Sequence, residues 1–148
     1  MRLLTKIVRR SPAELLLAAE ALLLLAFFRV CLALVPVRRI IRTITRGHPS
    51  TIESIQTAPG ELDAAIARRV RWAVEAVARH SPIAFVCFPQ TLAAYTMLRL
   101  RGVRSTMVYG VARSPVNKLT AHTWLMVGDR CVLGGEGAGE FTAVERWS

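Results

Sequence analysis

The sequence is poor in cysteine and histidine, with three residues of each type among 148. Cys31, Cys87 and Cys131 are an odd number without close spacing, which argues against a disulfide framework. A zinc site would need pairs such as CxxC or HxxxH, and the histidines are too scattered to form a ligand set. We therefore expect no metal, no cofactor and a reducing cytoplasm, with Cys31 and Cys131 as small core residues.

Acidic residues are also few. The chain has 20 Lys and Arg residues against 10 Asp and Glu residues, for a net charge of +10, and residues 1–50 supply +7 of it. Basic helices suit an acidic peptide, an acidic partner protein, a membrane surface or nucleic acid. Nucleic acid is disfavoured because no stacking aromatics interleave with these charges and no recognition motif is present. A solvated basic face is the alternative to a partner.

One long apolar run follows a helix-start signal, Ser11-Pro12-Ala13-Glu14. The run from Leu15 to Val35 holds only two charges, Glu20 and Arg29, and a bilayer takes about 20 apolar residues to cross. Each charge near the centre of a span costs about 2.5–3.5 kcal/mol. No small-residue cleavage site of a signal peptide follows. We therefore expect residues 15–35 to pack on the core or lie on a membrane surface; a true span is the alternative.

The rest of the N-terminal half is also predicted to be helical. Residues 37–46 form a short basic amphipathic helix, and residues 47–59 read as a linker. From Glu61 to His80 the apolar residues recur at helical spacing, at Leu62, Ile66, Val70, Ala73 and Val77. This pattern divides the chain into N-terminal helices and linker (1–60) and a core (61–148), in one compact unit.

The C-terminal half changes from a helical to a strand pattern. Pro89 suits the first turn of a helix and Gly102 suits the residue after its end. Beyond a strand at 107–111 and a loop at 113–118, further strands are expected at 119–127, 130–133 and 141–144. Gly128-Asp129 marks the reversal between the second and third strands. Helices followed by a small antiparallel sheet predict an α+β domain.

Cys87 and His122 are the candidate chemical pair. Cys87 stands at the mouth of the helix, where unpaired N–H groups and the helix dipole favour a thiolate. His122 follows in the strand LTAHTWLMV, and a thiol meeting an imidazole makes an activated nucleophile. The backbone N–H groups of Cys87 and Phe88 are the better oxyanion donors, with Gln90 as a further candidate. Trp124 either walls this site or belongs to the core.

Several segments accompany this pair in a fixed order: Leu98–Val103, Met107–Val111, Ala121-His122-Thr123-Trp124 and Phe141–Val144. Together, residues 87–144 resemble the transglutaminase-like cysteine peptidases that remove leader peptides in lasso-peptide biosynthesis. The preceding hydrophobic and Arg-rich helices resemble the N-terminal half of stand-alone members. The resemblance implies a papain-like Cys–His–acid hydrolase, with a nucleophile helix packed on a small antiparallel sheet.

The acid of that constellation is not where the resemblance places it. In the resembled family, an Asp follows the His by about a dozen residues, whereas this chain has Gly there, in Leu133-Gly134-Gly135-Glu136. Asp129 is seven residues from His122, and at about 3.3 Å per strand residue that is more than roughly 20 Å away. We interpret Asp129 as a turn residue.

The register of the predicted hairpin then decides on Glu136. A three-residue turn, Gly128-Asp129-Arg130, would place Glu136 opposite His122. A two-residue turn would place Gly135 there instead, unless a bulge at Gly134-Gly135 corrects it. We predict Cys87, His122 and Glu136 as the catalytic residues, with a backbone carbonyl or an amide side chain as the alternative to Glu136.

The resemblance also implies a function and partners. The expected activity is that of a cysteine endopeptidase that cuts a lasso-peptide precursor between leader and core. A separate small leader-binding protein and an ATP-dependent lasso cyclase are the expected partners, and the basic N-terminal helices are candidate docking sites. The alternatives are a transglutaminase-like acyltransferase, which passes through the same thioester, and a membrane-associated scaffold with a structural Cys/His pair.

Overall fold

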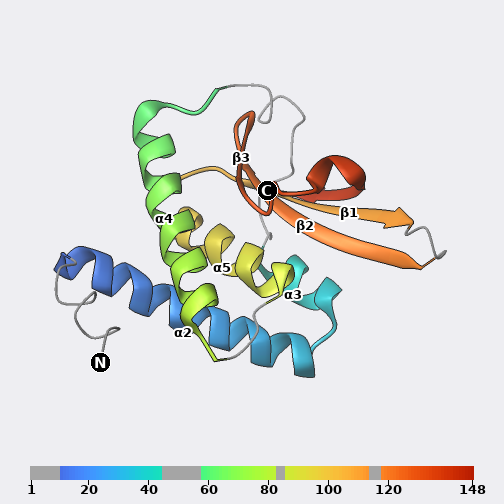
Figure 1. Cartoon of the computed structure of the whole chain (residues 1–148), viewed down its shortest axis with the longest axis horizontal. Coiled ribbons are helices and arrows are strands. Elements are labelled where there is room, and N and C mark those ends of the chain that lie inside the picture. The colour runs from blue at the N-terminus through green and yellow to red at the C-terminus, as the bar shows by residue number, and fades with distance from the viewer. Residues whose placement is uncertain (1–10, 45–57, 83–85, 114–117) are drawn as a thin grey trace.

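The computed structural model describes residues 11–44, 58–82, 86–113 and 118–148. Within these ranges, helices precede a four-stranded antiparallel sheet of order β3-β2-β1-β4 (Figure 1). The helices are α2 (Pro12–Leu34), α3 (Val37–Ile44), α4 (Glu61–His80) and α5 (Cys87–Leu100). The strands are β1 (Thr106–Arg113), β2 (Leu119–Val127), β3 (Arg130–Leu133) and β4 (Thr142–Trp147), with a 3-10 turn, η2 (Ala138–Glu140), before β4. The predicted α+β class is confirmed, while most of the predicted linker at 47–59 and of the loop at 113–118 lies outside the described residues.

The start of α2 follows from its sequence signal. Ser11 Oγ accepts a hydrogen bond from the Glu14 N–H at 3.3 Å, and the Glu14 carboxylate accepts one from the Ser11 N–H at 3.2 Å. This reciprocal pair is the capping box that the sequence predicts, and Pro12 occupies the first helical position. Along the helix one face is buried against α4 and α5, through Leu17, Ala21, Leu25 and Phe28.

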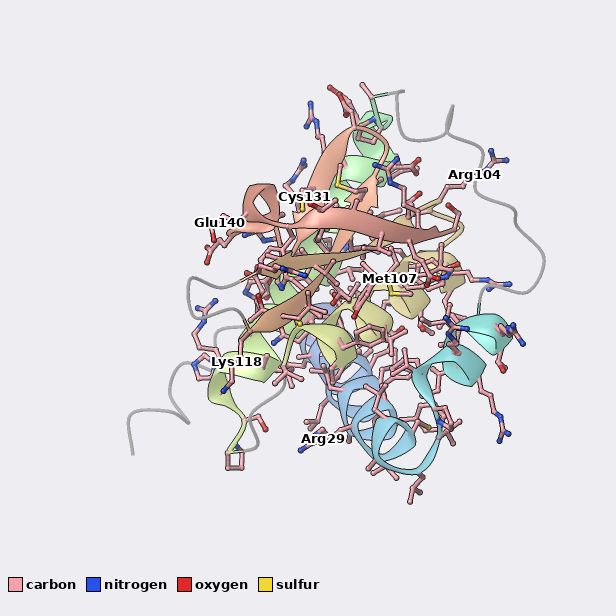
Figure 2. All side chains as sticks on the ribbon, turned by 90° about the vertical axis from the view of Figure 1, so that its right-hand side faces the viewer. Arg29, Arg104, Met107, Lys118, Cys131 and Glu140 are labelled. Atoms are coloured by element: carbon pink, nitrogen blue, oxygen red, sulfur yellow. The ribbon has the colours of Figure 1, made fainter. Side chains whose placement is uncertain are left out.

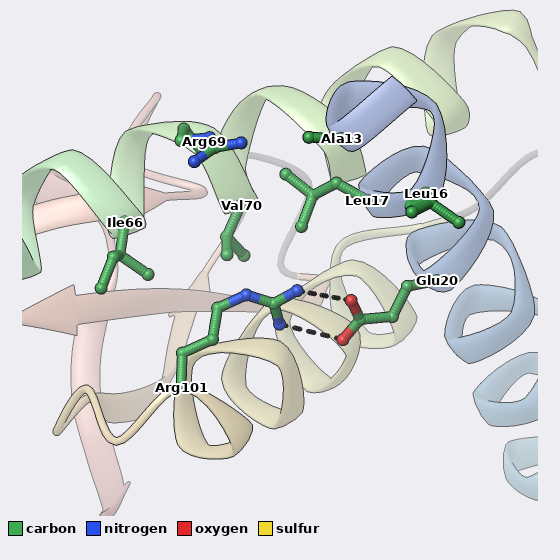
Figure 3. Close-up of a pocket in the computed structure, with 8 residues that line it drawn as sticks. All are labelled: Ala13, Leu16, Leu17, Glu20, Ile66, Arg69, Val70 and Arg101. Atoms are coloured by element: carbon green, nitrogen blue, oxygen red, sulfur yellow. Dashed lines mark hydrogen bonds and ion pairs between the residues drawn. The ribbon is translucent and has the colours of Figure 1, made fainter. Parts of the chain in front are cut away.

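Glu20, the acidic residue inside the apolar run, is paired. The Arg101 guanidinium donates to both of its carboxylate oxygens, at 2.9 and 2.5 Å, beside a groove of about 290 Å³ between α2, α4 and α5 (Figure 3). Hydrogen bonding to Glu20 raises the pKa of Arg101. Both side chains are about 30% exposed, so this ion pair adds little stability, yet it joins α2 to the end of α5.

Helix α4 has the predicted bounds, but its buried face differs in part from the prediction. Ala67, Val70, Ala73 and Val74 are buried, whereas Leu62, predicted to face the core, is 74% exposed. Leu62 belongs to the first turn of α4, and that end of the helix extends beyond α2 and α5 (Figure 1). The helical period is therefore correct, but there is no neighbour for its first position to pack on.

Helix α5 lies at the centre of the core. Eight of its residues are buried, and the core cluster continues from α2 and α4 through α5 into the sheet. Its C-terminal end closes as predicted at Gly102, which has φ +72°, while the Val103 N–H donates to the Leu98 carbonyl at 3.0 Å. Met107 of β1 is fully buried between sheet and helices (Figure 2). α3 is held to α5 because Arg99 donates to the Ile44 carbonyl.

Candidate active site

Cys87 is the first residue of α5 and is half-buried. The N-cap residue, Val86, makes no side-chain capping bond, and the first turn contains no acidic residue. The first N–H groups of a helix have no acceptor within the helix itself, and no acidic side chain of this turn neutralises the positive end of the helix dipole. Cys87 therefore stands at the start of the helix, as the sequence predicts.

A buried pair of threonines fixes this turn against the sheet. Thr91 Oγ1 donates to the Cys87 carbonyl at 2.9 Å and lies 3.1 Å from Thr123 Oγ1, and both threonines are buried. Thr123 is the next residue after His122 in β2. The hydrogen bonds therefore connect the nucleophile helix to the strand of the candidate base. This pair was not predicted from the sequence, because no spacing pattern signals a contact between a helix residue and a strand residue 32 positions apart.

The His122 ring has a defined hydrogen bond. Its Nε2 lies 2.7 Å from the backbone oxygen of Gly134. A carbonyl oxygen can only accept, so Nε2 carries the hydrogen and, in the neutral ring, Nδ1 keeps its lone pair. His122 is thus held as the tautomer in which Nδ1 has the free lone pair.

Aromatic side chains fix the plane of this ring. Trp124 stacks on His122 with ring centroids 6.1 Å apart, and Phe141 lies at 5.2 Å. Gly110, the cross-strand partner of His122, gives the Trp124 ring its space, because a Cβ there would meet that ring at 2.8 Å. Trp124 is itself buried and does not line the cleft that contains Cys87, so it is a core residue that supports the His122 ring.

Gly134 occupies the position where the resemblance places an Asp. Its φ of +74° lies in the region that favours glycine, and a Cβ on this backbone would stand 2.6 Å from the Thr123 oxygen. A side chain at this position would therefore shift the backbone. The acceptor for His122 at position 134 is a backbone carbonyl, which is the alternative that the sequence analysis kept open.

Of the two turns considered from sequence, the structure has the shorter one, and the three-residue turn that would place Glu136 opposite His122 is absent. Val127 pairs with Arg130, so the turn has two residues, Gly128-Asp129, with Gly128 at φ +57°. A bulge then shifts the register by one, between the pairs Met126–Cys131 and Leu125–Leu133. β3 ends at Leu133, so Glu136 has no ladder partner opposite His122. A glycine with positive φ favours the tighter turn, and the bulge lies two residues earlier than the one considered from sequence.

The three predicted catalytic residues nevertheless line one cleft. Its volume is about 880 Å³, and its lining includes Cys87, His122 and Glu136 together with Gln90 at the start of α5. Asp129 does not line it. Charged residues of α4 form another part of the wall, where Arg71 donates to Glu75 at 2.8 Å. Among the described residues no hydrogen bond joins Cys87 to His122, and no cluster of His, Cys, Asp and Glu could hold a metal ion.

Cys131 also lines this cleft, which corrects its interpretation as a core residue. It is exposed because β3 is the edge strand of the sheet, whereas Cys31 is half-buried against the core. Partial desolvation raises the pKa of the Cys131 thiol, and the hydrogen bond with the Leu133 backbone and the positive charge of Arg71 oppose this only in part. Cys131 therefore stays protonated more readily than an ordinary cysteine, which makes it a poor nucleophile.

A helix that begins with cysteine, a sheet with an oriented histidine and a cleft lined by both define the class of transglutaminase-like α+β domains. The family described as the transglutaminase-like superfamily matches residues 24–146. The chain belongs to this superfamily, which comprises cysteine proteases and transglutaminases. No curated protein and no solved structure matches the chain.

Substitutions of Glu136 and Asp129 test which carboxylate is the acid of the predicted Cys–His–acid set. We expect Glu136→Gln to lower kcat by roughly tenfold, far less than the roughly ten-thousandfold loss after removal of a triad acid, because the Gly134 carbonyl already holds His122 Nε2. Asp129→Asn, at the exposed hairpin turn, should leave kcat unchanged. Steady-state kinetics of both folded variants measure this. A larger loss of kcat for Asp129→Asn than for Glu136→Gln would contradict the assignment of Glu136, and not Asp129, to the cleft.

Proposed function

We propose that this chain is a cysteine endopeptidase that cuts a lasso-peptide precursor between its leader and its core. The family supports thiol-dependent chemistry on peptide or amide carbonyls. The segments Leu98–Val103, Ala121–Trp124 and Phe141–Val144, which resemble leader peptidases, support the particular substrate. The observation that carries the proposal is the hydrogen bond from His122 Nε2 to Gly134, which leaves Nδ1 for a thiol in the cleft shared with Cys87.

In the proposed reaction the Cys87 thiolate attacks the scissile carbonyl, while the N–H groups of Cys87 and Phe88 donate to the developing oxyanion. Protonated His122 gives its Nδ1 proton to the leaving amine, which releases the core peptide and leaves the leader as a thioester. Nδ1 then takes a proton from water, the hydroxide attacks the thioester, and the thiolate is released. The leader departs with a new carboxyl group.

Two residues are proposed to support the imidazolium during this cycle. Nε2 keeps its hydrogen in both charge states of the ring, so its bond to the Gly134 carbonyl persists throughout. Glu136 lines the same cleft and is proposed as the acid of the Cys–His–acid set. A backbone group, the Gly134 carbonyl, fixes the orientation of the ring.

Acyl transfer to an amine is the second candidate function. The superfamily includes transglutaminases, and the thioester is common to both reactions. What differs is the group that attacks the thioester, and water reaches an open cleft of about 880 Å³ without a dedicated binding site. We therefore favour hydrolysis. A scaffold role, with a structural Cys/His pair, is the candidate that predicts no product at all.

The test is cleavage of the full precursor peptide, followed by mass spectrometry. We expect one cut, with a leader fragment that has gained water even when a primary amine is present in excess. We also expect a separate leader-binding protein to raise kcat/KM at least tenfold, because the described residues before α5 form only helices and offer no strand edge to pair with a leader.

A precursor with a scrambled leader is the matched control, and the partner should not stimulate its cleavage. Equal rates with and without the leader-binding protein would count against this division of labour between two proteins. An amine adduct on the leader fragment would favour the acyltransferase, and an intact precursor would favour the scaffold. The ATP-dependent cyclase is proposed to act on the released core peptide.

A further inference from the structure

Helix α2 has two apolar faces, of which only one is covered. The side facing α4 and α5 is buried, through Leu17, Ala21, Leu25 and Phe28. The opposite side is exposed, and we call it the outer face of α2. Leu23 and Leu34 on it are 71% and 77% exposed, and Leu16, at its margin, is 73% exposed and also lines the groove beside Glu20. Its other large apolar residues are Leu15, Leu22, Phe27 and Val30. Monomeric soluble proteins rarely present a continuous apolar surface of this extent to water.

The shape of the outer face argues against a single partner helix. At about 100° per residue, its exposed apolar residues cover an arc of about 140°, and from Leu15 to Leu34 they extend about 30 Å along the axis. Ala19, Ala26 and Ala33 are exposed within the same arc. A coiled-coil seam is narrower than this, whereas helices that lie at a bilayer surface present a broad apolar face.

Charge at the margins of the outer face is positive. Arg29 borders the arc next to Leu22 and extends away from the body of the protein (Figure 2). Beyond the C-terminal end of α2, helix α3 carries exposed arginines at positions 38, 39 and 42. The acidic residues of α2 are engaged elsewhere, because Glu20 binds Arg101 and Glu14 caps the helix. This distribution complements phosphate groups and leaves no free acid on the outer face.

We propose that the outer face of α2 lies on the surface of an anionic lipid bilayer, with the helix axis parallel to the membrane. Arg29 and the arginines of α3 then meet the phosphate headgroups. Helix α2 is long and apolar enough to span a bilayer. A span, however, would expose Glu20 to lipid and break the contacts of α2 with α4 and α5. Surface binding needs no rearrangement, and it concerns a face remote in sequence from Cys87 and His122.

Vesicle co-sedimentation of the full chain tests this proposal. One set of vesicles is phosphatidylcholine with about 30% phosphatidylglycerol, which makes the surface negative; the other is pure phosphatidylcholine. We expect the mixed vesicles to bind the protein at least tenfold more tightly. The double variant Leu23→Gln/Leu34→Gln should bind the mixed vesicles about tenfold more weakly or worse. Leu62→Gln is the matched control, because Leu62 is equally exposed, at 74%, but lies on α4. Its binding should equal that of the wild type.

The outcomes separate the possible occupants of the outer face. Unchanged vesicle binding in the double variant, with its circular dichroism intact, would overturn the proposal. So would an absence of vesicle binding combined with a dimer that the double variant dissociates, which would assign the face to a second copy of the chain. Protein that stays in the vesicle pellet after a carbonate wash would indicate a transmembrane span.

Discussion

Replacing Cys87 with alanine is expected to abolish cleavage of the precursor. Every proposed covalent step passes through the Cys87 sulfur, and alanine offers no nucleophile, so only the background rate of uncatalysed hydrolysis should remain. Alkylation of this position by iodoacetamide should disappear as well. Cleavage followed by mass spectrometry, together with peptide mapping after alkylation, measures both effects. The variant should stay folded, because residue 87 is only half-buried and its backbone carbonyl still accepts from Thr91.

Cys131→Ala is the control for this experiment. Cys131 lines the same cleft, but partial desolvation raises the pKa of its thiol, and it lies at the edge strand instead of a helix start. Its removal should leave turnover close to that of the wild type, because no step of the proposed reaction uses its thiol. Cleavage at the wild-type rate by Cys87→Ala, or loss of cleavage in Cys131→Ala, would show that Cys87 is not the nucleophile.

His122→Ala should cost the enzyme about 10²–10⁴-fold in kcat, the range for removal of a general acid–base group. The loss should not add to that of Cys87, so the double variant should be no worse than Cys87→Ala alone, because the two side chains act on one step. His80→Ala is the control, since His80 is exposed and its Nδ1 forms a hydrogen bond with the Ala76 carbonyl of its own helix. Activity of His122→Ala within tenfold of the wild type would contradict its role.

The orientation of His122 has a readout that is independent of turnover. In nitrogen-15 NMR spectra of the neutral ring, the hydrogen is expected on Nε2, because that atom donates to Gly134. Chemical shifts of the two ring nitrogens distinguish this tautomer from its alternative. A hydrogen on Nδ1 in the neutral form would mean that the carbonyl contact does not set the tautomer in solution.

The elements of the fold follow closely from local sequence signals. The bounds of α4, β2 and β3 agree with those predicted from periodicity, and the capping box at Ser11 and the glycine end at Gly102 mark helix ends as expected. Such signals are local, because a helix cap or a strand period depends on a few neighbouring residues. They are therefore readable from one sequence.

Relations between elements were much less predictable. A bulge of one residue changes the register of β2 and β3, and Leu125 and Met126 give no sign of it. The Thr91–Thr123 pair and the exposed position of Leu62 depend on how helices and strands meet, which periodicity does not describe. The partner of His122 was hidden for a different reason. It is a main-chain oxygen, and every residue type supplies one.

This use of a main-chain oxygen changes what can damage the site. A carboxylate partner is lost when its codon changes or when acid protonates it, whereas a peptide carbonyl has no side chain to lose and does not titrate in the physiological range. Its place depends on the number of residues between His122 and Gly134 and on the local backbone turn. Insertions or deletions in this hairpin should therefore be tolerated far less than exchanges of its exposed side chains. During divergence of the family, the length of this hairpin would stay constant while its exposed side chains change.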